Sequence, residues 1–203
     1  MLPKNEEERY SQKKTDRYPD FMMNIILFGF KKCGKTYYGL KAAQKLHMHF
    51  VDSDLLLEQH YHKIYHQALS YRDIAKKHGF PFFKTLEKHV VSLLMQQKNS
   101  IISLGGGVVL DPENLMRLEQ LGTMIYLKVS KQTLEHRLLS TEPPAYIDSK
   151  NPISSFNAMY EERLPIYEGI KAHTIDIEGL KEEEILQKIC LFIQEIKENN
   201  HGK

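Results

Sequence analysis

The segment that decides the fold is Met23-Asn-Ile-Ile-Leu-Phe-Gly-Phe-Lys-Lys-Cys-Gly-Lys-Thr36, an apolar run followed directly by a glycine-rich loop. Its last eight residues, Gly29 to Thr36, match the pattern GxxxxGK[ST]. In that pattern the glycines let backbone N–H groups converge on a phosphate, the lysine reaches the β- and γ-phosphates, and the hydroxyl can ligate Mg²⁺. Helix-forming residues follow at 37–46. The context therefore predicts a site for a nucleoside triphosphate, and the alternative is a glycine turn that binds nothing.

Short apolar runs alternate with amphipathic stretches along the rest of the chain. The predicted strands are Ile25–Phe28, His49–Val51, Ile101–Leu104, Thr123–Leu127 and Thr174–Ile177. Helical sequence separates each strand from the next, which is typical of an α/β fold with a parallel sheet.

Several helix boundaries are explicit in the sequence. Asp111-Pro112 offers an N-cap and a proline at the first helical position, and Gly122 closes the same helix. Ser130 can cap the next helix. Near the C-terminus, isoleucines at 185, 189, 193 and 196 form a stripe that should pack against the sheet.

The bulk properties favour one domain that acts on small molecules. The 203 residues are 41% hydrophobic, enough for one core, and the formal net charge of +2 gives little support for nucleic-acid binding. The two cysteines lie far apart, which fits a reducing compartment. Neither a membrane-spanning run nor a secretory signal is recognisable, so we expect a cytoplasmic protein. We predict a flexible extension at 1–21, a domain at 22–198 and a tail at 199–203.

Three further motifs follow the phosphate loop. Asp52-Ser53-Asp54 ends the second predicted strand, so both carboxylates lie at the strand's carboxyl edge, where ligands of α/β proteins bind. Leu104-Gly105-Gly106-Gly107 follows the third strand and offers backbone that a ligand can approach closely. Arg163-Leu-Pro-Ile-Tyr167 supplies a cation. Each motif is weak by itself, and their order on one strand-helix framework strengthens them.

Together these motifs resemble the shikimate kinase family, over approximately residues 23–196. The resemblance implies a three-layer P-loop fold, with a five-stranded parallel sheet flanked by helices and a mobile lid. It also implies transfer of the ATP γ-phosphoryl group to the 3-hydroxyl of shikimate, in aromatic amino-acid biosynthesis. We expect ATP and Mg²⁺ as cofactors, shikimate as the partner, and a monomer.

The resemblance also assigns roles to individual residues. Lys35 and Asp54 would be catalytic, with Asp54 binding and deprotonating the acceptor hydroxyl. Thr36 and Asp52 would hold the metal. The nucleotide would contact Gly29, Lys32, Cys33, Gly34, Lys35, Thr36, Tyr37 and Arg137. Shikimate would contact Asp54, Lys84, Gly105, Gly106, Gly107 and Arg163, with Arg163 pairing with its carboxylate.

Two arginines of the family pattern are missing. Lysine stands at position 84, where the family has arginine, so the charge remains but the bidentate fork is lost. The lid segment Ser140–Tyr146 contains no arginine. An arginine at the transferring phosphoryl group can be worth roughly 10³ to 10⁵ in rate. The alternatives are therefore a nucleotide-binding relative with little or no activity, and a kinase for another small hydroxy acid.

Lysines could compensate for the missing arginine of the lid. Lys31 and Lys32 stand inside the phosphate loop, where relatives usually have small or neutral residues. We hypothesise that Lys32 supplies part of the missing charge. The alternative is that both lysines point to solvent and only raise the general affinity for polyanions. Lys150, the cation of the lid, is a further candidate.

Overall fold

A computed structural model describes residues 23–140, 147 and 150–201 of the chain. The predicted extension at 1–21 lies outside these residues, as does segment 141–146 of the predicted lid. The last helix continues to His201, through the start of the predicted tail.

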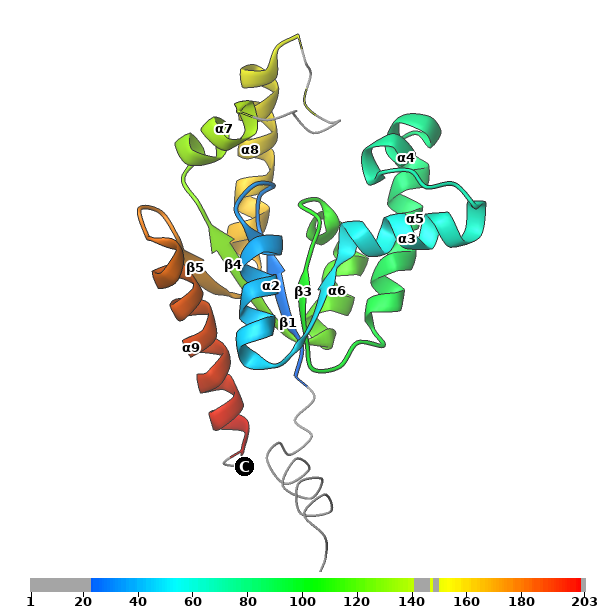
Figure 1. The fold of residues 1–203 in the computed structure, drawn as a ribbon. Helices are drawn as coiled ribbons and strands as arrows, with labels where there is room; N and C mark the ends of the chain where they lie inside the picture. The colour runs from blue at the N-terminus through cyan, green and yellow to red at the C-terminus, as the bar shows by residue number, and fades with distance from the viewer. Residues whose placement is uncertain (1–22, 141–146, 148–149, 202–203) are drawn as a thin grey trace, which may run out of the picture.

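The described residues contain one five-stranded parallel sheet with the order β2-β3-β1-β4-β5, as Figure 1 shows. The strands are β1 (Ile25–Phe28), β2 (His49–Asp52), β3 (Ser100–Ser103), β4 (Thr123–Lys128) and β5 (His173–Asp176). All five predicted strands are confirmed, with ends within one residue of those expected. Because β2, β3 and β1 are neighbours, the three loops that follow them meet at one edge of the sheet.

Eight α-helices complete the described part of the fold. They are α2 (Lys35–Leu46), α3 (Ser53–Tyr65), α4 (Tyr71–His78), α5 (Phe80–Leu94), α6 (Pro112–Leu121), α7 (Lys131–Leu139), α8 (Pro152–Gly169) and α9 (Glu182–His201). In Figure 1, α2 and α9 lie in front of the sheet and α6 lies behind it, so the expected three layers are present. Within 23–140 and 150–201, no helix is both long enough and apolar enough to cross a lipid bilayer.

The predicted caps are present. One oxygen of Asp111 accepts hydrogen bonds from the amides of residues 113 and 114 at the start of α6, and Gly122 ends that helix. The Ser130 hydroxyl caps α7 by accepting from the Thr133 amide at 3.2 Å. On α9, three isoleucines of the predicted stripe, at 185, 189 and 193, are buried in the main core.

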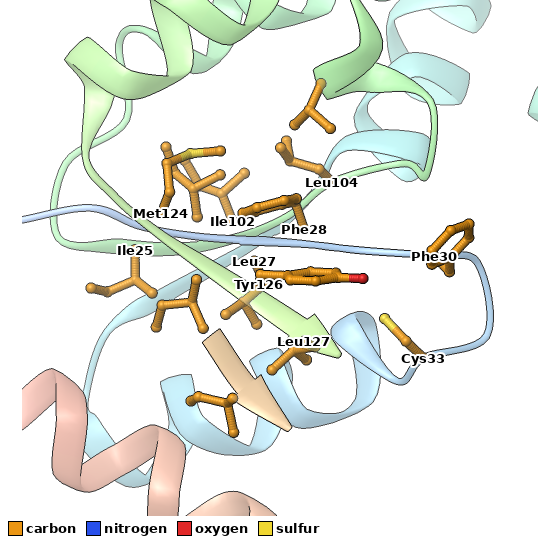
Figure 2. Close-up of a cluster of buried hydrophobic side chains, with 14 of the residues drawn as sticks. Ile25, Leu27, Phe28, Phe30, Cys33, Ile102, Leu104, Met124, Tyr126 and Leu127 are labelled. Carbon is orange, nitrogen blue, oxygen red and sulfur yellow. The ribbon is translucent and has the colours of Figure 1, made fainter. Parts of the chain in front are cut away.

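The core lies on both sides of β1, every residue of which is buried. Figure 2 shows Phe28 and Met124 on one side of the sheet and Ile25 and Leu127 on the other. Alternate side chains of a strand point to opposite faces, so a central strand covered on both sides must be apolar throughout. This buried strand fixes the position of the loop that follows it.

Asn24 fastens the opposite end of the sheet. Its side-chain amide donates to the carbonyls of Gln97 at 2.8 Å and Leu121 at 3.3 Å. Its carbonyl oxygen accepts from the Ser100 amide at 3.1 Å. One buried polar side chain therefore joins the starts of β1 and β3 to the end of α6.

Replacing Asn24 with alanine should lower the free energy of unfolding by about 3 kcal/mol, because three hydrogen bonds disappear and buried backbone groups lose their partners. Urea denaturation followed by circular dichroism measures this loss. Asn151, an exposed asparagine whose side chain makes no capping bond, provides the matched control. Asn151→Ala should change the free energy by less than about 0.5 kcal/mol. Equal effects of the two substitutions would contradict the assignment.

Candidate active site

The phosphate loop joins β1 to α2 and is closed by its own lysine. Gly34 has φ 105°, and a Cβ there would come within 2.7 Å of the Tyr38 ring, so only glycine fits. Lys35 begins α2, is 7% exposed, and donates to the carbonyls of Gly29 at 3.0 Å and Phe30 at 2.9 Å. The N-terminus of α2 thus stands behind a curled loop, an arrangement that favours a phosphate group.

Asp52 links the phosphate loop to α3. Its Oδ1 accepts from the amides of Asp54 at 2.9 Å and Leu55 at 3.2 Å, which caps α3. Its Oδ2 accepts from the Thr36 hydroxyl at 2.7 Å. Thr36 is also 3.2 Å from the Ser103 hydroxyl at the end of β3. The two predicted metal ligands therefore present adjacent oxygens, as a hard cation requires.

Asp54 lies in the first turn of α3, against the glycine loop. A Cβ at Gly105 would approach its Oδ1 to 2.3 Å, so the carboxylate and the loop backbone are close neighbours. Burial, and secondarily the charge of Asp52, raise the pKa of Asp54 to about 6, while Lys31 and Lys35 oppose this shift. A carboxylate with a raised pKa is a stronger base, which suits it to accept a proton from an alcohol.

In the glycine loop at 105–107, each glycine makes a hydrogen bond to a different helix. The Gly105 amide donates to the Ser53 hydroxyl of α3 at 2.8 Å. The Gly106 carbonyl accepts from the Tyr167 hydroxyl of α8, and the Gly107 carbonyl accepts from Lys84 of α5 at 3.1 Å. The loop is therefore positioned by three elements that are distant in sequence.

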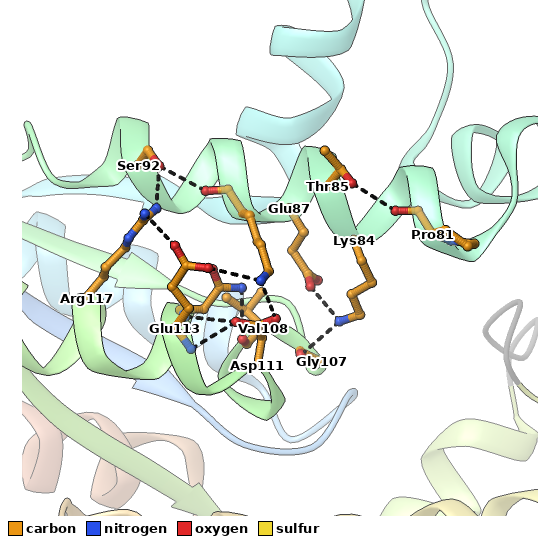
Figure 3. Close-up of polar contacts among 12 residues, drawn as sticks. Pro81, Lys84, Thr85, Glu87, Ser92, Gly107, Val108, Asp111, Glu113 and Arg117 are labelled. Atoms are coloured by element: carbon orange, nitrogen blue, oxygen red, sulfur yellow. Dashed lines mark hydrogen bonds and ion pairs between the residues drawn. The ribbon is translucent and has the colours of Figure 1, made fainter.

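The other end of the site carries the cations expected for an anionic acceptor. Lys84 makes an ion pair with Glu87 at 2.5 Å, one helical turn along α5, as Figure 3 shows. Burial raises the pKa of Glu87, while Lys84 and Arg163 lower it. Lys84 thus shares its charge between Glu87, the Gly107 carbonyl and any ligand. Arg163 of α8 lines the same cavity.

A cavity of about 920 Å³ brings most of the predicted residues together. Its walls include Lys32, Gly34, Lys35, Thr36, Tyr37, Asp52, Asp54, Lys84, Gly105, Gly106, Gly107 and Arg163. Three predicted nucleotide residues do not line it, namely Gly29, Cys33 and Arg137. The Cys33 side chain is buried in the core, and Arg137 donates to the Lys32 carbonyl at 3.2 Å. Gly29 and Cys33 therefore shape the loop from behind, and Arg137 braces it from α7.

The structure also gives the two loop lysines different surroundings. Lys31 is partly buried and donates to the Tyr71 hydroxyl of α4, so the alternative in which both lysines point to solvent is wrong for Lys31. Lys32 has φ 69°, a left-handed conformation that is uncommon for a residue with a side chain.

Sequence reasoning missed several residues of the site. Ser53 and Glu87 were not singled out, although Ser53 stands between the two aspartates and Glu87 is three residues from Lys84, a helical spacing. Tyr71 was missed because it contacts Lys31 from 40 residues away in sequence, which no local pattern reveals, and Arg72 was missed with it because Arg72 reaches the site by donating to the Tyr71 hydroxyl.

A P-loop, a carboxylate pair at the edge of a parallel sheet and a cation-lined cavity define the chain as a P-loop kinase of a small hydroxylated substrate. A sequence model of the family described as "Shikimate kinase" matches residues 31–194. The chain belongs to the shikimate kinase family.

Known relatives and solved structures are similar over nearly the whole described chain. Shikimate kinase from Caldanaerobacter subterraneus subsp. tengcongensis is 34% identical over 168 residues, which cover 83% of this chain and 94% of that protein. Shikimate kinase from Thermodesulfovibrio yellowstonii is 34% identical over 183 residues, with 90% and 99% covered. The structure of shikimate kinase from Acinetobacter baumannii in complex with shikimate is similar with a TM-score of 0.76 at 27% identity, covering 88% of this chain and 96% of that one.

Proposed function

We propose that the protein transfers the γ-phosphoryl group of ATP to the 3-hydroxyl of shikimate, giving shikimate 3-phosphate for aromatic amino-acid biosynthesis. The observation that carries this proposal is the position of Asp54, which shares one cavity with Lys35 of the phosphate loop and with Arg163 at the far side. The shikimate-bound relative supports the choice of acceptor.

In the proposed reaction, Asp54 orients the 3-hydroxyl and takes its proton. The hydroxyl oxygen forms a bond to the γ-phosphorus, and the bond from that phosphorus to the β–γ bridging oxygen breaks, leaving ADP. Lys35 neutralises charge on the phosphates during this step. The chain needs no covalent intermediate, because positioning and charge neutralisation provide most of the catalysis in phosphoryl transfer.

Mg²⁺ would be held by the Thr36 hydroxyl and Asp52 Oδ2. The chemistry of the pair fits this ion, since both atoms are oxygens, they lie 2.7 Å apart, and Mg²⁺ in kinases is bound by few protein ligands together with substrate phosphates. When bound, the ion would screen the β- and γ-phosphates. Asp52 Oδ1 stays committed to the cap of α3, which keeps Oδ2 directed at Thr36.

The shikimate carboxylate would lie between Arg163 and Lys84. Arginine can grip a carboxylate with two parallel hydrogen bonds, whereas lysine offers a point charge. Since Lys84 is also paired with Glu87, we expect weaker acceptor binding than a pair of arginines would give. We also propose that the protein acts as a monomer in the cytoplasm, where ATP is available.

An ADP-release assay with ATP, Mg²⁺ and shikimate tests the proposal. We expect turnover of about 1 to 100 s⁻¹, the usual range for kinases. Gluconate should support much slower release, because its open chain does not hold the carboxylate and the hydroxyl at the fixed separation that a ring gives. Faster release with gluconate would move the acceptor to another hydroxy acid. No release with any acceptor, despite ATP binding, would favour the nucleotide-binding relative that the missing lid arginine suggests.

A further inference from the structure

Two cations meet at one phenol oxygen on the wall of the cavity. Lys31 of the phosphate loop donates to the Tyr71 hydroxyl, and Arg72 Nε donates to the same oxygen at 3.1 Å. The Lys31 ammonium also lies 4.3 Å from the centre of the Tyr71 ring. All three residues line the cavity, and we call them the α4 cation cluster.

The hydrogen bonding of the α4 cation cluster makes it a set of donors. A tyrosine hydroxyl can accept hydrogen bonds and can also donate its own proton. Lys31 and Arg72 both donate to the Tyr71 oxygen, so the Tyr71 proton is available for an acceptor outside this pair. Two positive charges and one O–H donor therefore converge at the same point. The group that such a cluster binds is an oxyanion, a phosphoryl group or a carboxylate.

The cluster is fixed in place from outside the cavity. The Tyr71 amide donates to Glu58 of α3 at 2.8 Å, and the Ser70 hydroxyl caps α4 by accepting from the Asp73 amide. The start of α4 is therefore anchored to the helix that carries Asp54. Little reorganisation is needed to present the tyrosine, which is the condition for strong electrostatic stabilisation.

Lys31 lies on the side of the phosphate loop that faces Gly106 of the glycine loop. A Cβ built at Gly106 would be 3.4 Å from the backbone nitrogen of Lys31 and 3.9 Å from the Cβ of Lys31. Burial lowers the pKa of Lys31 to about 8, Asp54 raises it, and Arg72, Lys32 and Lys35 lower it further. These charges act on Lys31 because they surround it, from the loop, from α3 and from α4. Lys31 thus stands beside the base and beside the lysine that contacts the phosphates.

A positive charge at Lys31 could replace the arginine that the lid segment lacks. Segment Ser140–Tyr146 has no arginine, and the transferring phosphoryl group spreads negative charge over three oxygens. We propose that Lys31, held by Tyr71 and Arg72, binds the phosphoryl group while it passes from the nucleotide to the acceptor. This inference rests on the proposed function for its acceptor, but not for its nucleotide. It assigns to Lys31 the compensating charge that the sequence alone had suggested for Lys32.

Lys31→Met should lower kcat about 10²-fold, as loss of one preorganised donor to a developing charge does, while ATP binding stays within about threefold. Tyr71→Phe should lower kcat by about fivefold, since it removes one hydrogen-bonding oxygen but leaves the ring and both cations. Lys77→Met is the matched control, because Lys77 is an exposed lysine of α4 that does not line the cavity. It should leave kcat unchanged. A kcat of Lys31→Met equal to that of Lys77→Met would overturn the inference.

A pH profile separates a charge at the phosphoryl group from a merely structural contact. In the parent protein kcat/KM should fall as pH rises through about 8, where Lys31 loses its proton. Asp54, Tyr71, Arg72, Lys32 and Lys35 face Lys31 and are unchanged in Lys31→Arg, whose side chain stays charged throughout. That variant should retain activity within about tenfold and lose the decline above pH 8. A decline that persists would contradict the role of Lys31.

A transition-state analogue tests the site without any acceptor. ADP, Mg²⁺ and aluminium fluoride mimic the nucleotide with a planar group at the γ-position. Calorimetry measures how much aluminium fluoride increases the affinity of the protein for ADP. We expect this tightening in the parent protein and in Lys77→Met, and its loss by at least about tenfold in Lys31→Met. Equal tightening in all three would overturn the inference. Failure of the proposed function has a different signature, namely absence of shikimate turnover with the Lys31 effect on the analogue intact.

Discussion

Replacing Lys35 with alanine should reduce turnover by at least about 10³-fold, because it removes the charge that meets the β- and γ-phosphates. The structure adds a second reason. The Lys35 ammonium also binds the carbonyls of Gly29 and Phe30 and is almost fully buried, so alanine leaves both carbonyls without this donor. The loop that should surround the phosphates would lose the hydrogen bonds that hold its backbone together, as well as its cation.

Steady-state kinetics and ATP titration together measure the two losses. We expect kcat to fall and ATP affinity to weaken. The free energy of unfolding should change by much less than the activation free energy does. Lys45→Ala provides the matched control, because Lys45 is an exposed lysine in the last turn of the same helix. Retained turnover in Lys35→Ala would remove the assignment of the phosphate loop.

Asp54→Asn should lower kcat by about 10³-fold, within the range for loss of a general base, and leave ATP binding unchanged. Asparagine is nearly the same size and can still orient a hydroxyl through its amide, but it cannot accept a proton. The tight contact with Gly105 makes this isosteric change preferable to alanine, which would open the pocket.

The comparison that decides the role of Asp54 is kcat against shikimate affinity. A large fall in kcat with retained affinity identifies the base, and a rise in the dissociation constant alone would identify a residue that only binds. Glu119→Gln removes a carboxylate from an exposed site on α6, outside the cavity, and should alter neither quantity.

The sheet and the phosphate loop could be predicted because their signals are local. A buried central strand such as Ile25–Phe28 must be apolar at every position, and Gly34 and Lys35 stand at fixed offsets from its end. The caps at Asp111 and Ser130 depend on neighbours within three residues, so they too were predictable.

The hydrogen bonds and ion pairs of the site were not predictable, because they depend on packing between segments that are distant in sequence. Lys84 was expected to serve the acceptor, but α5 places Glu87 beside it and the glycine loop brings the Gly107 carbonyl within reach. Gly29 and Cys33 belong to the loop pattern, yet the curl of the loop turns them away from the cavity. The segment before α4 gave no pattern strong enough to place Tyr71 near the phosphate loop.

The two oxygens of Asp52 have separate duties, one at the start of α3 and one at Thr36. Under the proposed function, this couples metal affinity to the placement of the base, since Asp54 follows two residues later. Few replacements could satisfy both duties. Asparagine would keep one acceptor for the helix but surrender the anionic charge, and glutamate would reach past the amides that it must cap. The position therefore leaves an engineer almost no freedom to retune the cation without also shifting the proton acceptor.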